Sequence, residues 1–100
     1  MKLFNEYYDE ALNAAFQGWD FSWVKNRMVV NQPSWDYREL VMEALSSADS
    51  LLDIDTGGGE FLSSLGEALP ATTCATENYG PNIEVAKKCL EPLGIEVVQR

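Results

Sequence analysis

The sequence predicts an α/β fold in which three parallel strands, in the order 3-2-1, follow a set of N-terminal helices. Apolar residues recur at helical spacing up to about residue 48, and short strand-like runs begin after it. From there strands and helices alternate with short connections, which favours right-handed crossovers and a parallel sheet. We therefore expect an N-terminal helical segment at residues 1–48 and an α/β unit at residues 49–100.

Three helices are expected in the N-terminal segment. The first covers residues 5–16 and ends before Gly18, and a short second helix begins with Asp20 as its N-cap. Ser34 is expected to cap the third helix, with Asp36 in its positively polarised first turn. The apolar stripes of the first and third helices are Phe4, Tyr8, Ala11, Leu12 and Ala15, and Tyr37, Leu40, Val41, Ala44 and Leu45.

The α/β unit contains three predicted strands and two predicted helices. The strands are residues 50–54, 71–76 and 95–99, and the helices between them are residues 60–69 and 82–93. Each helix has one apolar side, formed by Phe61, Leu62, Leu65 and Leu69 in the first and by Ile83, Ala86, Leu90 and Leu93 in the second. These sides are expected to pack against the sheet.

The composition is that of a globular protein, with 46% hydrophobic residues. No apolar run is long enough to span a bilayer, and the first residues lack the apolar core of a signal peptide. Cys74 and Cys89 lie within predicted regular elements, which suits free thiols in a reducing compartment. We therefore expect a cytoplasmic protein without membrane association.

The charge of the chain argues against two kinds of site. The net charge is −9, and the seven Lys and Arg residues form no patch, so direct nucleic-acid binding by these residues is not expected. The chain contains no His, the commonest general base and metal ligand, and no metal site is expected.

A glycine run follows the first predicted strand. Gly57, Gly58 and Gly59 allow the backbone to approach a ligand closely, at a helix N-terminus whose free amides carry positive partial charge. Glu77 follows the second strand, and a carboxylate at that edge of the sheet can accept both hydroxyls of a ribose. The dinucleotide pattern G-x-G-x-x-G fails because Leu62 occupies the position of its third glycine, which disfavours an NAD-dependent oxidoreductase. The pattern predicts a nucleoside-containing ligand.

Residues 51–59, with the sequence LLDIDTGGG, resemble the cofactor loop of the class I S-adenosylmethionine-dependent methyltransferases. Asp53, Gly57, Gly59 and Glu77 match that family's motif, and the resemblance extends over about residues 34–100. It implies a truncated Rossmann-like, doubly wound sheet and S-adenosylmethionine as the cofactor. The cofactor-binding residues that it implies are Asp53, Asp55, Thr56, Gly57, Gly58, Gly59, Glu77 and Asn78.

The resemblance also implies roles for these residues. Asp53 would hold the loop and the ammonium group of the cofactor, and Gly57 with its neighbours would line the methionine moiety. Glu77 would bind the ribose hydroxyls, and Asn78 would lie near the adenine. Asp55 departs from the family pattern, which usually has glycine there. Its side chain would either crowd the methionine end of the ligand or repel its carboxylate, or it would instead pair with the ammonium group or accept hydrogen bonds from nearby loop amides.

Two aromatic clusters precede the α/β unit, Trp19-Asp20-Phe21 and Trp35-Asp36-Tyr37. They would either cover the cofactor or acceptor pocket, or fix the N-terminal helices to the sheet. We favour packing, because large aromatic side chains dominate the cores of small domains.

The sheet of the methyltransferase family has seven strands, whereas this chain ends after the third. The parts of the family fold that usually carry the catalytic residues and the acceptor site would follow strand four. We therefore expect no methyl transfer by these 100 residues alone, and the methyl acceptor and catalytic residues stay unassigned. Two functions remain open: the cofactor half of a methyltransferase, and a non-catalytic binding module with a nucleotide-binding half-fold. The open edge and uncovered face of the sheet predict self-association.

Overall fold

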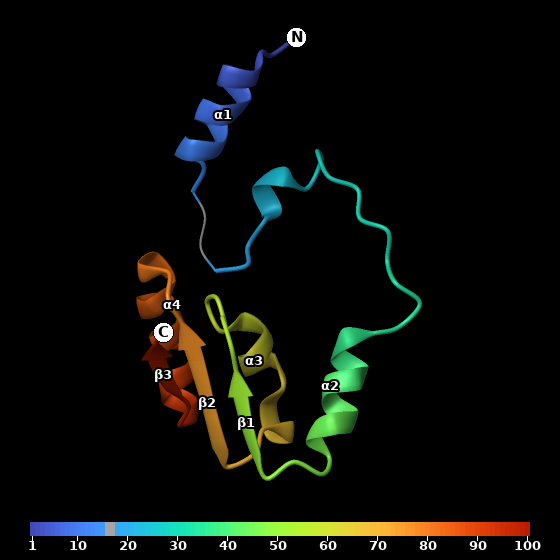
Figure 1. Cartoon of the computed structure of the whole chain (residues 1–100), viewed down its shortest axis with the longest axis vertical. Helices are drawn as coiled ribbons and strands as arrows, with labels where there is room; N and C mark the ends of the chain where they lie inside the picture. The colour runs from blue at the N-terminus through green and yellow to red at the C-terminus, as the bar shows by residue number, and fades with distance from the viewer. Residues whose placement is uncertain (16–17) are drawn as a thin grey trace.

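A three-stranded, all-parallel open sheet forms the centre of the protein, whose computed structural model describes residues 1–15 and 18–100 (Figure 1). The strands are β1 (Ser50–Asp53), β2 (Thr72–Glu77) and β3 (Glu96–Gln99), with β2 between the other two. The register pairs Asp53 with Ala75 and Ala75 with Val97. The predicted α/β class with a parallel sheet is confirmed.

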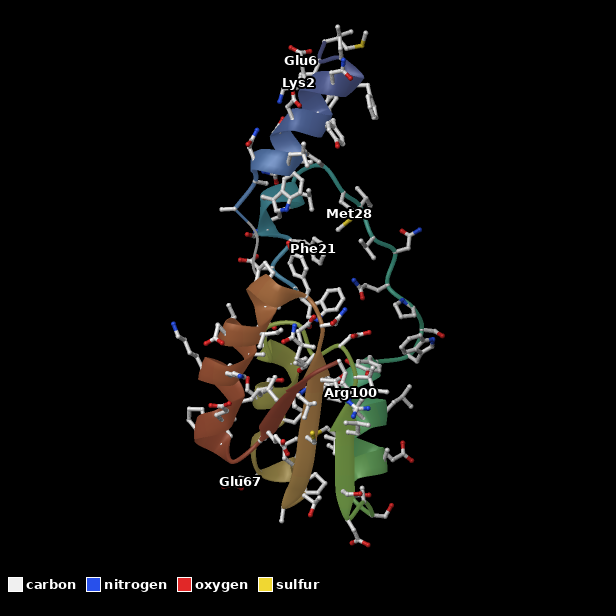
Figure 2. All side chains as sticks on the ribbon, turned by 60° about the vertical axis from the view of Figure 1, so that its left-hand side comes forward. Lys2, Glu6, Phe21, Met28, Glu67 and Arg100 are labelled. Carbon is white, nitrogen blue, oxygen red and sulfur yellow. The ribbon has the colours of Figure 1, made fainter. Side chains whose placement is uncertain are left out.

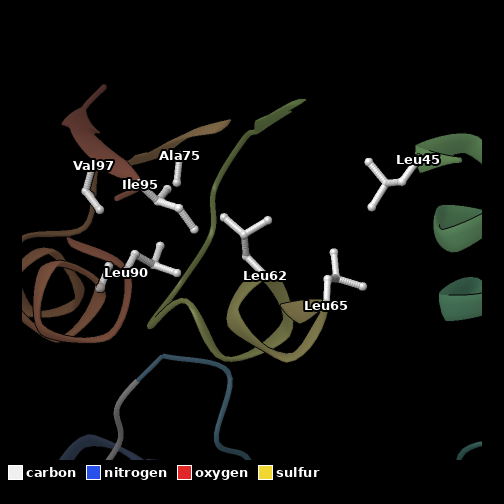
Figure 3. Packing of buried hydrophobic residues seen from close by; sticks show 8 residues of the cluster. Leu45, Leu62, Leu65, Ala75, Leu90, Ile95 and Val97 are labelled. Carbon is white, nitrogen blue, oxygen red and sulfur yellow. The ribbon is translucent and has the colours of Figure 1, made fainter. Parts of the chain in front are cut away.

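Helices α3 (Glu60–Ser64) and α4 (Gly80–Leu90) pack on one face of the sheet and contribute Leu62, Ala86 and Leu90 to the core. Leu62 and Leu90 are the largest fully buried side chains, and they lie near Ala75 and Val97 of the sheet (Figure 3). The alternation of strand side chains puts Leu52 on the opposite face, where it is 56% exposed. The sheet is therefore covered by helices on one face only.

Both helices of the α/β unit differ from their predicted bounds. The helix predicted over 60–69 ends at Ser64, and a 3₁₀ turn, Gly66–Ala68, follows it, with Gly66 at φ +54°. Helix α4 begins before Pro81, since a proline in the first turn needs no hydrogen-bond partner for its nitrogen. It ends at Leu90 in a second 3₁₀ turn, because Pro92 cannot donate an i→i−4 hydrogen bond.

The N-terminal segment contains α1 (Phe4–Asn13), a 3₁₀ turn over Ser22–Val24, and α2 (Tyr37–Leu45). The cap predicted at Ser34 is wrong: the Asp36 carboxylate accepts a 3.0 Å hydrogen bond from the Glu39 amide and caps α2. The prediction that α1 extends to residue 16 and ends near Gly18 is also wrong, because the helix ends at Asn13; residue 16 itself lies outside the described residues. Asp20 lies before the 3₁₀ turn and accepts a 3.0 Å hydrogen bond from the Ser22 amide.

The apolar stripes of the N-terminal helices are mostly exposed. Helix α1 has no buried residue, because it extends away from the sheet (Figure 1). In α2 only Leu45 is buried, while Tyr37 is 61% exposed and packs its ring 5.3 Å from that of Phe61. Arg38 fixes α2 to α3 through hydrogen bonds of 2.7 and 2.8 Å to Ser64. Among the described residues, no helix is long and apolar enough to cross a membrane.

Candidate functional site

The loop between β1 and α3 turns at three residues with positive φ. These are Asp55 at +58°, Gly57 at +68° and Gly59 at +84°. The loop is held to the end of β2 by the Thr56 amide, which donates to the Thr76 carbonyl at 2.9 Å, and by the Asp55 amide, which donates to the Thr76 hydroxyl at 3.2 Å. The predicted glycine loop therefore lies at the carboxyl edge of the parallel sheet.

Asp55 has a backbone conformation that favours glycine. It is the one non-glycine residue with positive φ among residues 1–15 and 18–100. Aspartate is among the few side chains that enter this left-handed region at modest cost. Its side chain is exposed, so the departure from the glycine pattern is accommodated without disturbing the loop hydrogen bonds.

Glu77 connects the glycine loop to the start of α4. Its carboxylate accepts 2.7 Å from the Gly57 amide through Oε2 and 2.9 Å from the Tyr79 amide through Oε1. The residue is only 5% exposed, so these two charge-assisted hydrogen bonds are shielded from water. Glu77 thus positions the loop, and each oxygen keeps a further lone pair that can accept from a ligand.

The other predicted site residues fall into two groups. Thr56, Gly57, Gly58 and Gly59 are buried beside Glu77, and the Thr56 hydroxyl oxygen has no hydrogen-bond partner within the described part of the chain. Asp53 and Asn78 are not drawn into this cluster by any described hydrogen bond. Asp53 lines a small cavity of about 80 Å³ with Tyr37 and Phe61, and Asn78 is exposed.

Three residues near the glycine loop, Gly18, Glu60 and Asn82, were not predicted as site residues, and a contact of Trp19 with the loop was the less favoured alternative. The Gly18 amide donates 2.9 Å to Asn82 Oδ1 in a buried hydrogen bond, and the Trp19 amide donates 3.3 Å to Glu60 Oε1. The Trp19 indole lies so close to Gly57 that a Cβ on this glycine would overlap it. The aromatic cluster at residues 19–21 was the signal for a contact of Trp19, whereas no sequence pattern marks Asn82 as the partner of Gly18.

A wide hollow lies away from this loop. It measures about 870 Å³ and is bordered by residues 32–36, α2 and Phe61. No group of three or more acidic or cysteine side chains in the described ranges is placed to hold a metal ion. The candidate site is therefore the glycine loop with Glu77, and Trp19 closes it from outside.

Comparisons with protein-family models, with curated proteins and with solved structures find no match to this chain. The functional interpretation consequently depends on the residues of the glycine loop, Glu77 and the segment that covers them.

Proposed function

We propose that residues 49–100 form the cofactor half of a class I S-adenosylmethionine-dependent methyltransferase, with a Rossmann-like sheet ordered 3-2-1. The observation that carries this proposal is the contact of Glu77, at the carboxyl end of β2, with the amide of Gly57. A carboxylate and a glycine loop at adjacent carboxyl edges of parallel strands form a common nucleoside site. Residues 49–100 identify neither the methyl acceptor nor the catalytic residues.

The cluster fits an adenosyl ligand in its chemistry. When bound, S-adenosylmethionine supplies a methyl group on a sulfonium centre. Glu77 would accept from the ribose hydroxyls with its remaining lone pairs, and the buried Thr56 hydroxyl has hydrogen-bonding capacity that the described residues leave unused. The glycines give the ligand access to the backbone.

Calorimetric titration with S-adenosylmethionine, S-adenosylhomocysteine and NAD tests the proposal. We expect binding of both adenosyl ligands and none of NAD, because Leu62 replaces a dinucleotide glycine. The Asp55→Gly variant should keep the fold, since glycine adopts φ +58° readily, and should bind S-adenosylmethionine with changed affinity. Unchanged affinity would show that Asp55 has no part in binding, and absence of adenosyl binding would contradict the proposal.

A second candidate function is a non-catalytic binding module that keeps the half-fold. It is favoured by the involvement of both Glu77 oxygens in backbone hydrogen bonds and by the position of Trp19 over Gly57. These contacts account for a stable loop without any ligand, in terms of packing alone. Binding of S-adenosylhomocysteine by the protein would exclude a module whose glycine loop takes no adenosyl ligand.

We further expect self-association through β1. This strand pairs only with β2 among the described strands, and Leu52 and Ile54 beside its free edge are 56% and 68% exposed. An unpaired apolar edge is a template for a second copy. Light scattering should show oligomers that increase with protein concentration and with salt, which screens the net charge of −9.

The Leu52→Lys variant should shift this equilibrium toward monomer, because lysine opposes edge pairing. Leu93→Lys is a matched control, since Leu93 is 55% exposed but lies in the turn after α4. A strictly monomeric wild-type protein at high concentration would contradict the expectation.

A further inference from the structure

The segment of residues 18–24, named here the strap, lies across the glycine loop. It passes the carboxyl end of the sheet before the chain continues through an extended linker to α2 (Figure 1). Its described contacts with the α/β unit include the Gly18 hydrogen bond to Asn82, the Trp19 hydrogen bond to Glu60, and the close approach of the indole to Gly57. The strap therefore contacts the loop and both helices that follow it.

The contact requires glycine on both sides. Gly18 has φ +55°, and a Cβ on it would overlap the Glu60 carboxylate and come within 2.9 Å of the Gly58 nitrogen. A Cβ on Gly57 would overlap the indole of Trp19. Backbone and ring thus approach the loop at a distance that leaves no room for a ligand between them.

The geometry points to a displaceable cover: the strap competes with an adenosyl ligand for the glycine loop, and Trp19 is the residue that occludes it. This inference rests on the proposed function for the identity of the ligand. The indole lies where a ligand would contact Gly57, and Glu77 and Thr56 beneath it are only 5% and 4% exposed. A ligand that uses these groups must first move the strap.

The segments on either side of the strap do not hold it firmly against the loop. The linker that follows the strap is exposed throughout residues 25–36, with Val29 95% exposed. Little burial therefore holds the linker in place. Arg27, just after the strap, forms an ion pair with Glu10, which ties α1 to the start of the linker. Figure 2 shows Phe21 between α1 and the α/β unit, and its ring lies 6.2 Å from that of Trp19. The described contacts of the strap with the α/β unit are local, so the strap can leave the loop by local opening without global unfolding.

If the ligand binds only molecules whose strap is open, its apparent affinity equals the intrinsic affinity multiplied by the fraction of open molecules. Removal of the indole should therefore raise affinity, whereas removal of a ring that merely sandwiches the ligand should lower it. We expect Trp19→Ala to bind S-adenosylhomocysteine about tenfold more tightly than the wild type. Trp35→Ala is the matched control. Trp35 is as exposed as Trp19, at 57% against 58%, but it lies in the linker and away from the glycine loop.

Amide hydrogen exchange without ligand tests the movement itself. The Gly18 and Trp19 amides should exchange at least about 100-fold faster than the amides of β2, because the strap opens locally. Exchange in step with β2 would overturn the inference, since the strap would then open only on global unfolding. Gly18→Ala, which keeps the indole but prevents close approach, should raise affinity in the same direction as Trp19→Ala.

The outcomes separate the two proposals. If the wild type binds an adenosyl ligand and Trp19→Ala leaves that affinity unchanged or lowers it, the inference that the strap competes with the ligand is wrong. The proposed function would then stand. Absence of binding in the wild type and in every variant would contradict the proposed function, while the exchange rates would still decide whether the strap opens.

Discussion

The Gly59→Ala substitution is expected to destabilise the protein by about 2–5 kcal/mol. Gly59 has φ +84°, and a left-handed conformation costs an alanine about 1–2 kcal/mol. The added Cβ would also lie 2.7 Å from Cγ of Leu90, which is fully buried, and forcing a methyl group into a packed core costs about 1–3 kcal/mol. Urea denaturation should show a lower midpoint at an unchanged slope.

Gly94→Ala separates the two contributions. Gly94 has φ +79°, close to that of Gly59, but no atom lies within 4 Å of an added Cβ. It should therefore lose only the conformational part, about 1–2 kcal/mol. Equal losses for the two variants would contradict a close contact between the loop and α4.

The Glu77→Gln substitution is expected to lower the free energy of unfolding by about 2–3 kcal/mol. The amide has a single acceptor oxygen, so either the buried Gly57 amide or the partly buried Tyr79 amide loses its partner. A hydrogen bond to a charged group contributes about 1.5–3 kcal/mol, and an unsatisfied buried donor adds to the loss. Chemical denaturation at neutral pH provides the measurement.

Glu84→Gln is the control for the loss of one negative charge, because Glu84 is exposed on α4. It should change stability by less than about 0.5 kcal/mol. If Glu77→Gln proved as mild as Glu84→Gln, the Glu77 carboxylate would not hold the loop. In Glu77→Gln we also expect faster amide exchange at Gly57, since its hydrogen bond is the one most directly affected.

Local patterns were sufficient for the α/β unit. The alternation of short apolar runs with amphipathic helices predicted the strands within about two residues, because a parallel strand and its helix bury their apolar sides in the same core. The glycine run predicted the turn after β1, and the structure adds the reason for its tolerance of Asp55, whose φ is +58°. The ends of α3 and α4 were less predictable, since Gly66 and Pro92 replace the last helical turns with 3₁₀ turns.

The N-terminal segment shows where sequence periodicity is insufficient. Helical spacing in α1 and α2 predicted two buried stripes, but Leu45 is the one buried side chain of the two helices. Periodicity states which residues share a side of a helix, and it does not state whether another element covers that side. For the same reason the sequence favoured packing for both aromatic clusters and did not show that Trp19 contacts Gly57.

The sequence by itself determined the class of the fold, the glycine loop and the acidic residue at the carboxyl end of β2, because each depends on neighbours close along the chain. Only the tertiary structure decided that Glu77 bonds the Gly57 amide, that Asn82 anchors Gly18, and that Trp19 covers the loop. The Gly18–Asn82 contact joins residues 64 positions apart. Contacts over such separations arise from the packing of whole elements, and no local spacing encodes them.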